Sequence, residues 1–202
     1  LDPSLGRSCR NLYLGMKSWA AYLSLAWFFR KLKEIGSETI READAKERTA
    51  LAGAERCTRT ILSYYDPKRG YIPALLDDED TSPIIPAIEG LVYPDRLGLT
   101  ELVAMDGPYG ALVRTLREHV INILKPGMCL FPDYGWKLSA NSINSWMSKI
   151  ALCQYICRKI LKIDFGADSE RHDRAHADWW RVGSSTNPGI DQIFNCETGG
   201  YG

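Results

Sequence analysis

Apolar side chains recur at three- and four-residue steps in five stretches of the chain, which is the spacing of one helical face. The pattern predicts helices at about residues 11–36, 38–65, 109–124, 142–161 and 169–181. The first stretch is apolar on nearly every face, whereas the second is densely charged at its start. Because a helix that is apolar all round must be enclosed by neighbours, the pattern predicts an inner helix followed by an outer one in an all-α fold.

Residues 66–94 interrupt this helical pattern. Pro67, Pro73 and Pro83 are among the prolines that prevent a long helix there. The stretch includes Glu89 within the otherwise apolar sequence IIPAIEGLVYP. Burying a lone carboxylate is costly unless it is paired. Glu89 is therefore either a site residue or a carboxylate in a structural hydrogen bond.

A short loop before the fourth predicted helix gathers polar and aromatic side chains. It contains Asp133, Trp136 and Lys137, and the amides Asn141 and Asn144 follow at the helix start. A flat aromatic ring beside a carboxylate, an ammonium group and two amides can stack on a sugar while hydrogen-bonding its hydroxyls. The alternative is a helix-entry loop in which Trp136 fills the core.

Composition narrows the class of protein. The 202 residues are 45% hydrophobic, and the 25 basic and 25 acidic residues give a net charge of zero. This indicates one globular domain over residues 1–202 and gives no sign of binding to nucleic acid or to an anionic membrane. No signal peptide or long uncharged apolar run is visible, and the six cysteines form no CxxC pair. We therefore expect a cytoplasmic protein without a membrane span.

Most catalytic motifs are absent from the sequence. It contains no GxSxG, GxxxxGK[ST] or strand-borne GxGxxG pattern, so we expect no nucleotide cofactor and no serine nucleophile. His172 and His176 are one helical turn apart in HDRAH, but no third ligand is evident. A metal-dependent hydrolase is thus the weaker alternative, and no metal site is expected. Carboxylate chemistry remains, and its candidates are Asp2, Glu89, Asp133 and Asp191.

Longer segments point to a family. These are LDPSLGRSCRNLYLGMKSWAAYLSL, GYIPALL with IIPAIEGLVYP, LFPDYGWKLSANSINSWMSKIALCQYICRKIL, AHADWW and DQIF. Together they resemble the C-terminal part of glycoside hydrolase family 52, the retaining β-xylosidases. The resemblance implies about half of an (α/α)6 barrel, belonging to an enzyme that releases xylose from xylo-oligosaccharides without a cofactor. It is compatible with a homodimer of the intact enzyme.

The same resemblance assigns roles to residues. Asp2, or an aspartate preceding Leu1, would be the general acid, while the glutamate nucleophile would lie upstream of this chain. The implied substrate contacts are Glu89, Asp133, Trp136, Lys137 and Asn144. Without a nucleophile the isolated chain would be inactive. A non-catalytic α-helical carbohydrate-binding or scaffold module is the alternative function.

Overall fold

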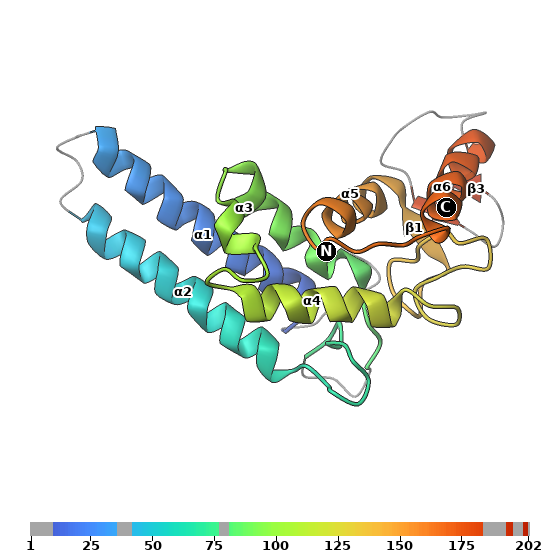
Figure 1. The fold of residues 1–202 in the computed structure, drawn as a ribbon, viewed down its shortest axis with the longest axis horizontal. Helices are drawn as coiled ribbons and strands as arrows, with labels where there is room; N and C mark the ends of the chain where they lie inside the picture. The colour runs from blue at the N-terminus through green and yellow to red at the C-terminus, as the bar shows by residue number, and fades with distance from the viewer. Residues whose placement is uncertain (1–9, 36–41, 77–80, 184–192, 196–199, 202) are drawn as a thin grey trace.

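The computed structural model describes residues 10–35, 42–76, 81–183, 193–195 and 200–201, and it is mostly helical (Figure 1). Six α-helices, two 3₁₀ helices and three short strands make up this part of the chain. The α-helices are α1 (Leu12–Ile35), α2 (Ala43–Ser63), α3 (Val92–Arg96), α4 (Gly110–Ile123), α5 (Met147–Lys159) and α6 (Asp168–Gly183). The 3₁₀ helices are η3 (Ile85–Leu91) and η4 (Thr100–Val103), and the strands are β1 (Asn144–Trp146), β2 (Ile193–Asn195) and β3 (Gly200–Tyr201).

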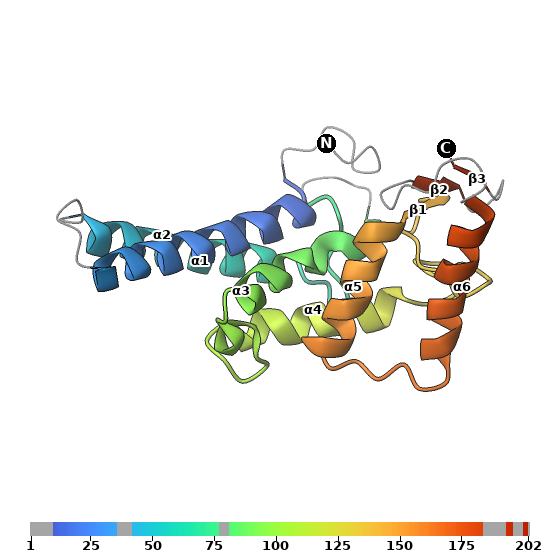
Figure 2. The ribbon, with the colours of Figure 1, turned by 90° about the horizontal axis from the view of Figure 1, so that it is seen from above.

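Helices α1 and α2 lie side by side along their whole length and form one end of the molecule (Figures 1 and 2). Their contact is close because a Cβ at Gly53 would lie only 2.6 Å from the ring of Tyr22. One face of α1, with Met16, Trp19 and Leu23, is fully buried. The expected complete enclosure of α1 is wrong for this part of the chain, since Phe28 is 47% exposed. Among the described elements, α2, η3 and α3 pack on α1 and leave that outer face open.

The middle of the molecule is built around η3. All seven residues of this 3₁₀ helix are buried, and it packs against α1 on one side and α5 on the other. A Cβ at Gly90 would lie 2.6 Å from the carbonyl oxygen of Met16, so only glycine permits this approach between η3 and α1. The prolines of this region prevent a long helix, as the sequence indicates, but the chain forms short helices there instead.

A small antiparallel sheet of order β1-β2-β3 lies at the other end, near α6 (Figure 2). Asn144 pairs with Asn195, and Trp146 pairs with Ile193. The prediction that a helix begins near residue 142 is therefore wrong. Residues 144–146 are extended because they pair with β2, and α5 begins at Met147 with Trp146 as its N-cap.

The expectation of a mostly helical chain is confirmed, and the half-barrel arrangement stays a prediction. Within the described ranges, no helix combines the length and the apolar character that crossing a membrane requires.

Candidate functional site

Glu89 lies at the centre of a polar cluster inside the helical part of the molecule. It is only 4% exposed and belongs to η3. Backbone hydrogen bonds fix the start of η3, because Ile85 N donates to Leu138 O over 2.9 Å and Ala140 N donates to Pro83 O over 3.2 Å. The segment that carries Glu89 is therefore tied to the segment that follows Lys137.

Two lysines and a tyrosine from other helices surround the Glu89 carboxylate. Lys17 Nζ of α1 lies 2.8 Å from Oε2, and Tyr13 OH donates to the same oxygen over 3.2 Å. Lys149 Nζ of α5 lies 3.7 Å from Oε1 and donates to Tyr13 OH over 2.8 Å. We use the name Glu89 cluster for Tyr13, Lys17, Glu89, Tyr93, Trp146 and Lys149.

The charge of the Glu89 cluster is unbalanced, with two ammonium groups around one carboxylate. Burial by itself would lower the pKa of Lys17, but its hydrogen bonds to Glu89 and Tyr93 outweigh that effect and raise this pKa above 10.5. Lys17 therefore stays charged at neutral pH. The side chains of Lys17 and Lys149 are 25% and 16% exposed, while that of Glu89 is 5% exposed, so the cluster opens to solvent through its cations.

Aromatic rings line the Glu89 cluster. Lys17 Nζ lies 4.5 Å from the ring centroid of Tyr93, and Lys149 Nζ lies 4.3 Å from that of Tyr13 and 5.0 Å from that of Trp146. These distances are within the range of cation–π attraction. Charged donors, one carboxylate and ring surfaces in a half-buried position are the groups that bind the hydroxyls and apolar edges of a sugar.

The predicted loop residues Asp133, Trp136 and Lys137 contact other partners. Asp133 is exposed, and its carboxylate accepts hydrogen bonds from Gly135 N over 2.9 Å and Trp179 Nε1 over 2.8 Å. Lys137 Nζ lies 5.1 Å from the ring centroid of Phe131. The structure thus holds Asp133 against α6 and gives Glu89 its own set of partners.

Trp136 is fully buried, and its ring packs edge-on against Phe165 and His172 at centroid distances of 5.7 and 5.5 Å. Its ring faces are covered, which favours the alternative of a tryptophan that fills the core. The backbone carbonyl of Trp136 accepts a hydrogen bond from the Ser145 hydroxyl over 2.9 Å. Through this bond the loop supports β1, which carries Trp146 of the Glu89 cluster.

His172 and His176 hold the same loop against α6. His172 Nδ1 donates to Tyr134 O over 2.8 Å, and Trp136 N donates to His176 Nε2 over 3.1 Å. Burial lowers the pKa of His172 and lowers that of His176 to about 3, so both rings are neutral near pH 7. No group of three or more metal-ligating side chains occurs in the described ranges. The described contacts of both imidazoles serve to position the loop.

The remaining predicted residues lie outside the Glu89 cluster or outside the described residues. Asn144 is the first residue of β1 and is backbone-paired with Asn195. Asp2 and Asp191 lie outside the described residues. His119, a histidine with no assigned role, is fully buried and bonds the backbone of Ile72 and Ile84 over 3.2 and 3.1 Å.

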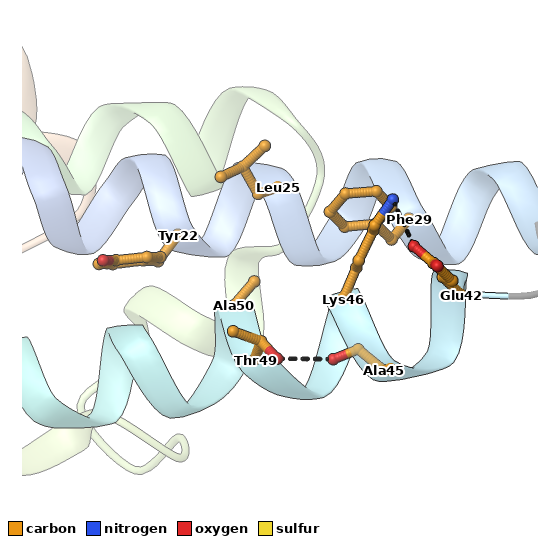
Figure 3. Close-up of a pocket in the computed structure, with 8 residues that line it drawn as sticks. All are labelled: Tyr22, Leu25, Phe29, Glu42, Ala45, Lys46, Thr49 and Ala50. Carbon is orange, nitrogen blue, oxygen red and sulfur yellow. Dashed lines mark hydrogen bonds and ion pairs between the residues drawn. The ribbon is translucent and has the colours of Figure 1, made fainter.

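Hollows elsewhere on the surface of the described residues lie apart from the Glu89 cluster. A groove of about 460 Å³ between α1 and α2 is lined mainly by apolar groups, including Tyr22, Leu25 and Phe29 (Figure 3). Its charged residues Glu42 and Lys46 pair with each other at 3.0 Å. A second hollow of about 350 Å³ lies between the Asp133 loop and α6, where Arg171 donates to Tyr134 OH over 2.9 Å. Neither hollow contains the cluster of buried charge that surrounds Glu89.

Sequence reasoning missed most of the Glu89 cluster. Tyr13 and Lys17 are four residues apart on α1, and Trp146 and Lys149 are three apart at the start of α5. The first spacing places Tyr13 and Lys17 on one helical face, whereas Trp146 ends β1 and Lys149 lies in the first turn of α5. A polar pair that interrupts an otherwise apolar stripe was the available signal, but a lysine in a helix is most often a solvated surface residue.

The sequence of the chain was compared with protein families and with known proteins. No family model matches the chain. The chain is 46% identical over 181 residues to a β-xylosidase from Geobacillus stearothermophilus, and this alignment covers 89% of the chain. The matched region is 24% of that enzyme, so the chain spans about a quarter of the length of its curated relative.

Proposed function

We propose that this chain is part of a glycoside hydrolase of the β-xylosidase type. The observation that carries the proposal is the 46% identity to the Geobacillus stearothermophilus β-xylosidase, which extends over 89% of the chain. Identity over so long a region implies that the two chains share the fold of that region. The Glu89 cluster supports the proposal because its chemistry suits a neutral, hydroxyl-rich ligand.

Within this proposal the chain supplies part of a retaining active site of the family 52 type, in a half-barrel of inner and outer helices. Retaining hydrolysis requires two carboxyl groups, one as nucleophile and one as general acid and base. The nucleophile is assigned to sequence upstream of Leu1. The general acid is Asp2 or an aspartate preceding Leu1.

The substrate in this proposal is a xylo-oligosaccharide that loses xylose from its non-reducing end. Glu89 is the substrate contact that the described contacts support best, because its carboxylate is buried among charged and aromatic groups. Asp133, Lys137 and Asn144 stay proposed contacts, and Trp136 acts through the support that its loop gives to β1.

A segment exchange tests the proposal. The 181-residue region of the Geobacillus stearothermophilus β-xylosidase that matches this chain is replaced by the corresponding region of this chain. We expect the chimera to hydrolyse an aryl β-xyloside and the 202-residue chain alone to be inactive.

The outcomes separate the alternatives. A folded chimera that binds xylose but does not turn over would favour a non-catalytic carbohydrate-binding module. Turnover by the isolated chain would place both catalytic carboxylates within it and would contradict the upstream nucleophile. Activity that requires added Zn²⁺ and is lost in a His172→Ala variant would favour the metal-dependent alternative.

A further inference from the structure

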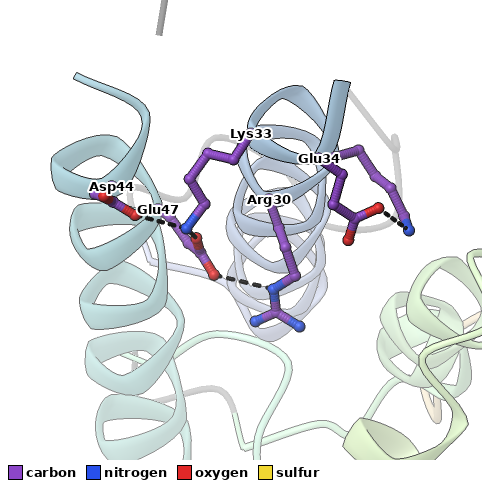
Figure 4. A network of polar contacts seen from close by, with 6 residues as sticks. Arg30, Lys33, Glu34, Asp44 and Glu47 are labelled. Carbon is purple, nitrogen blue, oxygen red and sulfur yellow. Dashed lines mark hydrogen bonds and ion pairs between the residues drawn. The ribbon is translucent and has the colours of Figure 1, made fainter. Parts of the chain in front are cut away.

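The part of the chain that the structure describes contains two buried glutamates that each face two cations, and they differ in how fully their oxygens are bonded. Glu47 of α2 is the first (Figure 4). Its Oε1 accepts a hydrogen bond from Arg30 Nε over 3.0 Å, and its Oε2 lies 2.6 Å from Lys33 Nζ. Both oxygens of Glu47 are therefore used, as expected of an ion pair that joins α1 to α2.

Of the two carboxylate oxygens of Glu89, only Oε2 accepts hydrogen bonds from the described residues. Its Oε2 receives both Lys17 and Tyr13, whereas Oε1 is buried and makes no hydrogen bond to any described residue. Lys149 Nζ lies 3.7 Å from Oε1, which is too far for a good hydrogen bond. A buried carboxylate oxygen without a donor costs free energy, so this oxygen is suited to a donor from outside the chain.

The 3.7 Å separation between Oε1 and Lys149 Nζ is itself informative. A single hydroxyl oxygen can lie roughly 2.7 Å from a carboxylate oxygen and about 2.9 Å from an ammonium nitrogen. Those two lengths close a triangle on a base of 3.7 Å. The group that fits must donate to Oε1 and accept from Nζ at once, which a hydroxyl does and a purely anionic or purely cationic group does not.

We propose that Glu89 Oε1 and Lys149 Nζ together bind one hydroxyl of a neutral pyranose sugar, with Trp146 as the bordering aromatic surface. Lys17 and Tyr13 act as positioning residues, because they fix the carboxylate through Oε2. This assignment deepens the proposed function and rests on it for the identity of the sugar, a β-xyloside. It makes Trp146, and not Trp136, the tryptophan beside the ligand.

The test compares three substitutions that each remove a charge and keep the side chain close to its original size. Glu89→Gln keeps the shape but gives the site a neutral amide, and Lys149→Met keeps the apolar stem but removes the ammonium group. Glu47→Gln is the matched control, since it neutralises the other buried glutamate with two cations. Binding of methyl β-xyloside to the 202-residue chain is measured by calorimetry, and KM and kcat for an aryl β-xyloside are measured in the chimera.

We expect Glu89→Gln and Lys149→Met each to weaken xyloside binding roughly tenfold or more, the effect of losing a charge-assisted hydrogen bond. Glu47→Gln is expected to lower the unfolding temperature and to leave xyloside affinity within about twofold of the unchanged protein. Unchanged xyloside affinity in both site variants, with a lowered unfolding temperature, would overturn the proposal and make the cluster a structural ion network.

Measurements on the 202-residue chain and on the chimera distinguish failure of the hydroxyl site from failure of the β-xylosidase assignment. Hydrolysis by the chimera with an unaltered KM in Glu89→Gln would refute the hydroxyl site and leave the β-xylosidase assignment in place. Glu89-dependent xyloside binding without hydrolysis by the chimera would support the hydroxyl site and refute the β-xylosidase assignment. Absence of xyloside binding in both forms would refute both.

Discussion

At the scale of single residues, Gly90 sets the distance between η3 and α1. A methyl group at this position would lie 2.6 Å from the Met16 carbonyl oxygen, which is backbone and cannot rotate away. We expect Gly90→Ala to destabilise the fold by about 2 kcal/mol or more, as overpacking in a core does. Chemical denaturation followed by far-UV circular dichroism measures this change.

Gly15 provides the control for that substitution. Its added Cβ would meet Ile61 side-chain carbons at 3.6 Å, which is ordinary contact, and it lies inside α1. We expect Gly15→Ala to stabilise the protein by roughly 0.5–1 kcal/mol through helix propensity. Equal effects of the two substitutions would contradict the close approach at Gly90.

Buried histidines give the fold a pH dependence. Burial lowers the pKa of His119 to about 4 and that of His176 to about 3, whereas unfolded histidine titrates near 6.5. As pH falls below 6.5 the unfolded chain therefore takes up protons that the folded chain does not, and stability falls. Full stability is present above that pH.

The expected loss is about 1.4 kcal/mol per histidine per pH unit between roughly pH 6.5 and pH 4. Unfolding free energies at pH 5, 6 and 7 measure it. His176→Gln is expected to be less stable at pH 7 but to show a shallower slope, because one titrating group is removed. Equal slopes in the two proteins would show that His176 is not buried as a neutral ring.

At the scale of elements, α6 is attached to the rest of the described chain mainly through the loop that contains Gly135. A Cβ at Gly135 would lie 2.1 Å from the ring of Trp179. We expect Gly135→Ala to separate this loop from α6 and to speed hydrogen exchange in α6 at least tenfold, while exchange in α1 is unchanged. Uniform acceleration across the chain would mean that α6 is part of the main cooperative unit.

Elements stabilised by residues close in sequence could be predicted, whereas elements that depend on a distant partner could not. The helix expected at residues 109–124 is present as α4 because Leu112, Leu116 and Val120 repeat on one face within the helix itself. Strand β1 was missed because it is extended only through its pairing with Ile193–Asn195, about fifty residues later. A periodicity argument contains no information on such a partner.

The residues of the candidate site could likewise be predicted only where their surroundings are local in sequence. Glu89 was correctly singled out as a carboxylate that needs partners, since its apolar neighbours are adjacent in sequence. Those partners come from α1 and α5, about seventy and sixty residues away, and no local pattern joins them. Trp136 has the surroundings of a sugar platform in sequence, but packing by Phe165 and His172 from later segments covers its ring.

At the scale of the whole molecule, α1 leaves an apolar stripe open. Leu14, Leu25 and Phe28 are 49%, 46% and 47% exposed and follow one another along the same helical face. Exposed apolar side chains on one helical face promote association. We expect the isolated chain to self-associate at micromolar concentration.

A double substitution tests this expectation. Leu25→Lys with Phe28→Glu introduces opposite charges three residues apart, a spacing that supports a helix. Light scattering over a concentration series should then give the monomer mass, with helix content by circular dichroism unchanged. A concentration-dependent mass in the double variant would place the association surface elsewhere.

The pairing of β1 with β2 has a practical consequence for anyone who expresses this protein. Residues 193–195 supply the hydrogen-bonding partner of β1, the strand that ends at Trp146 and leads into the helix of Lys149. A stop codon placed before Ile193 would remove no residue of the Glu89 cluster, yet it would leave the strand that presents Trp146 without its backbone partner. The choice of the expressed C-terminal boundary is therefore also a choice about the shape of the Glu89 cluster.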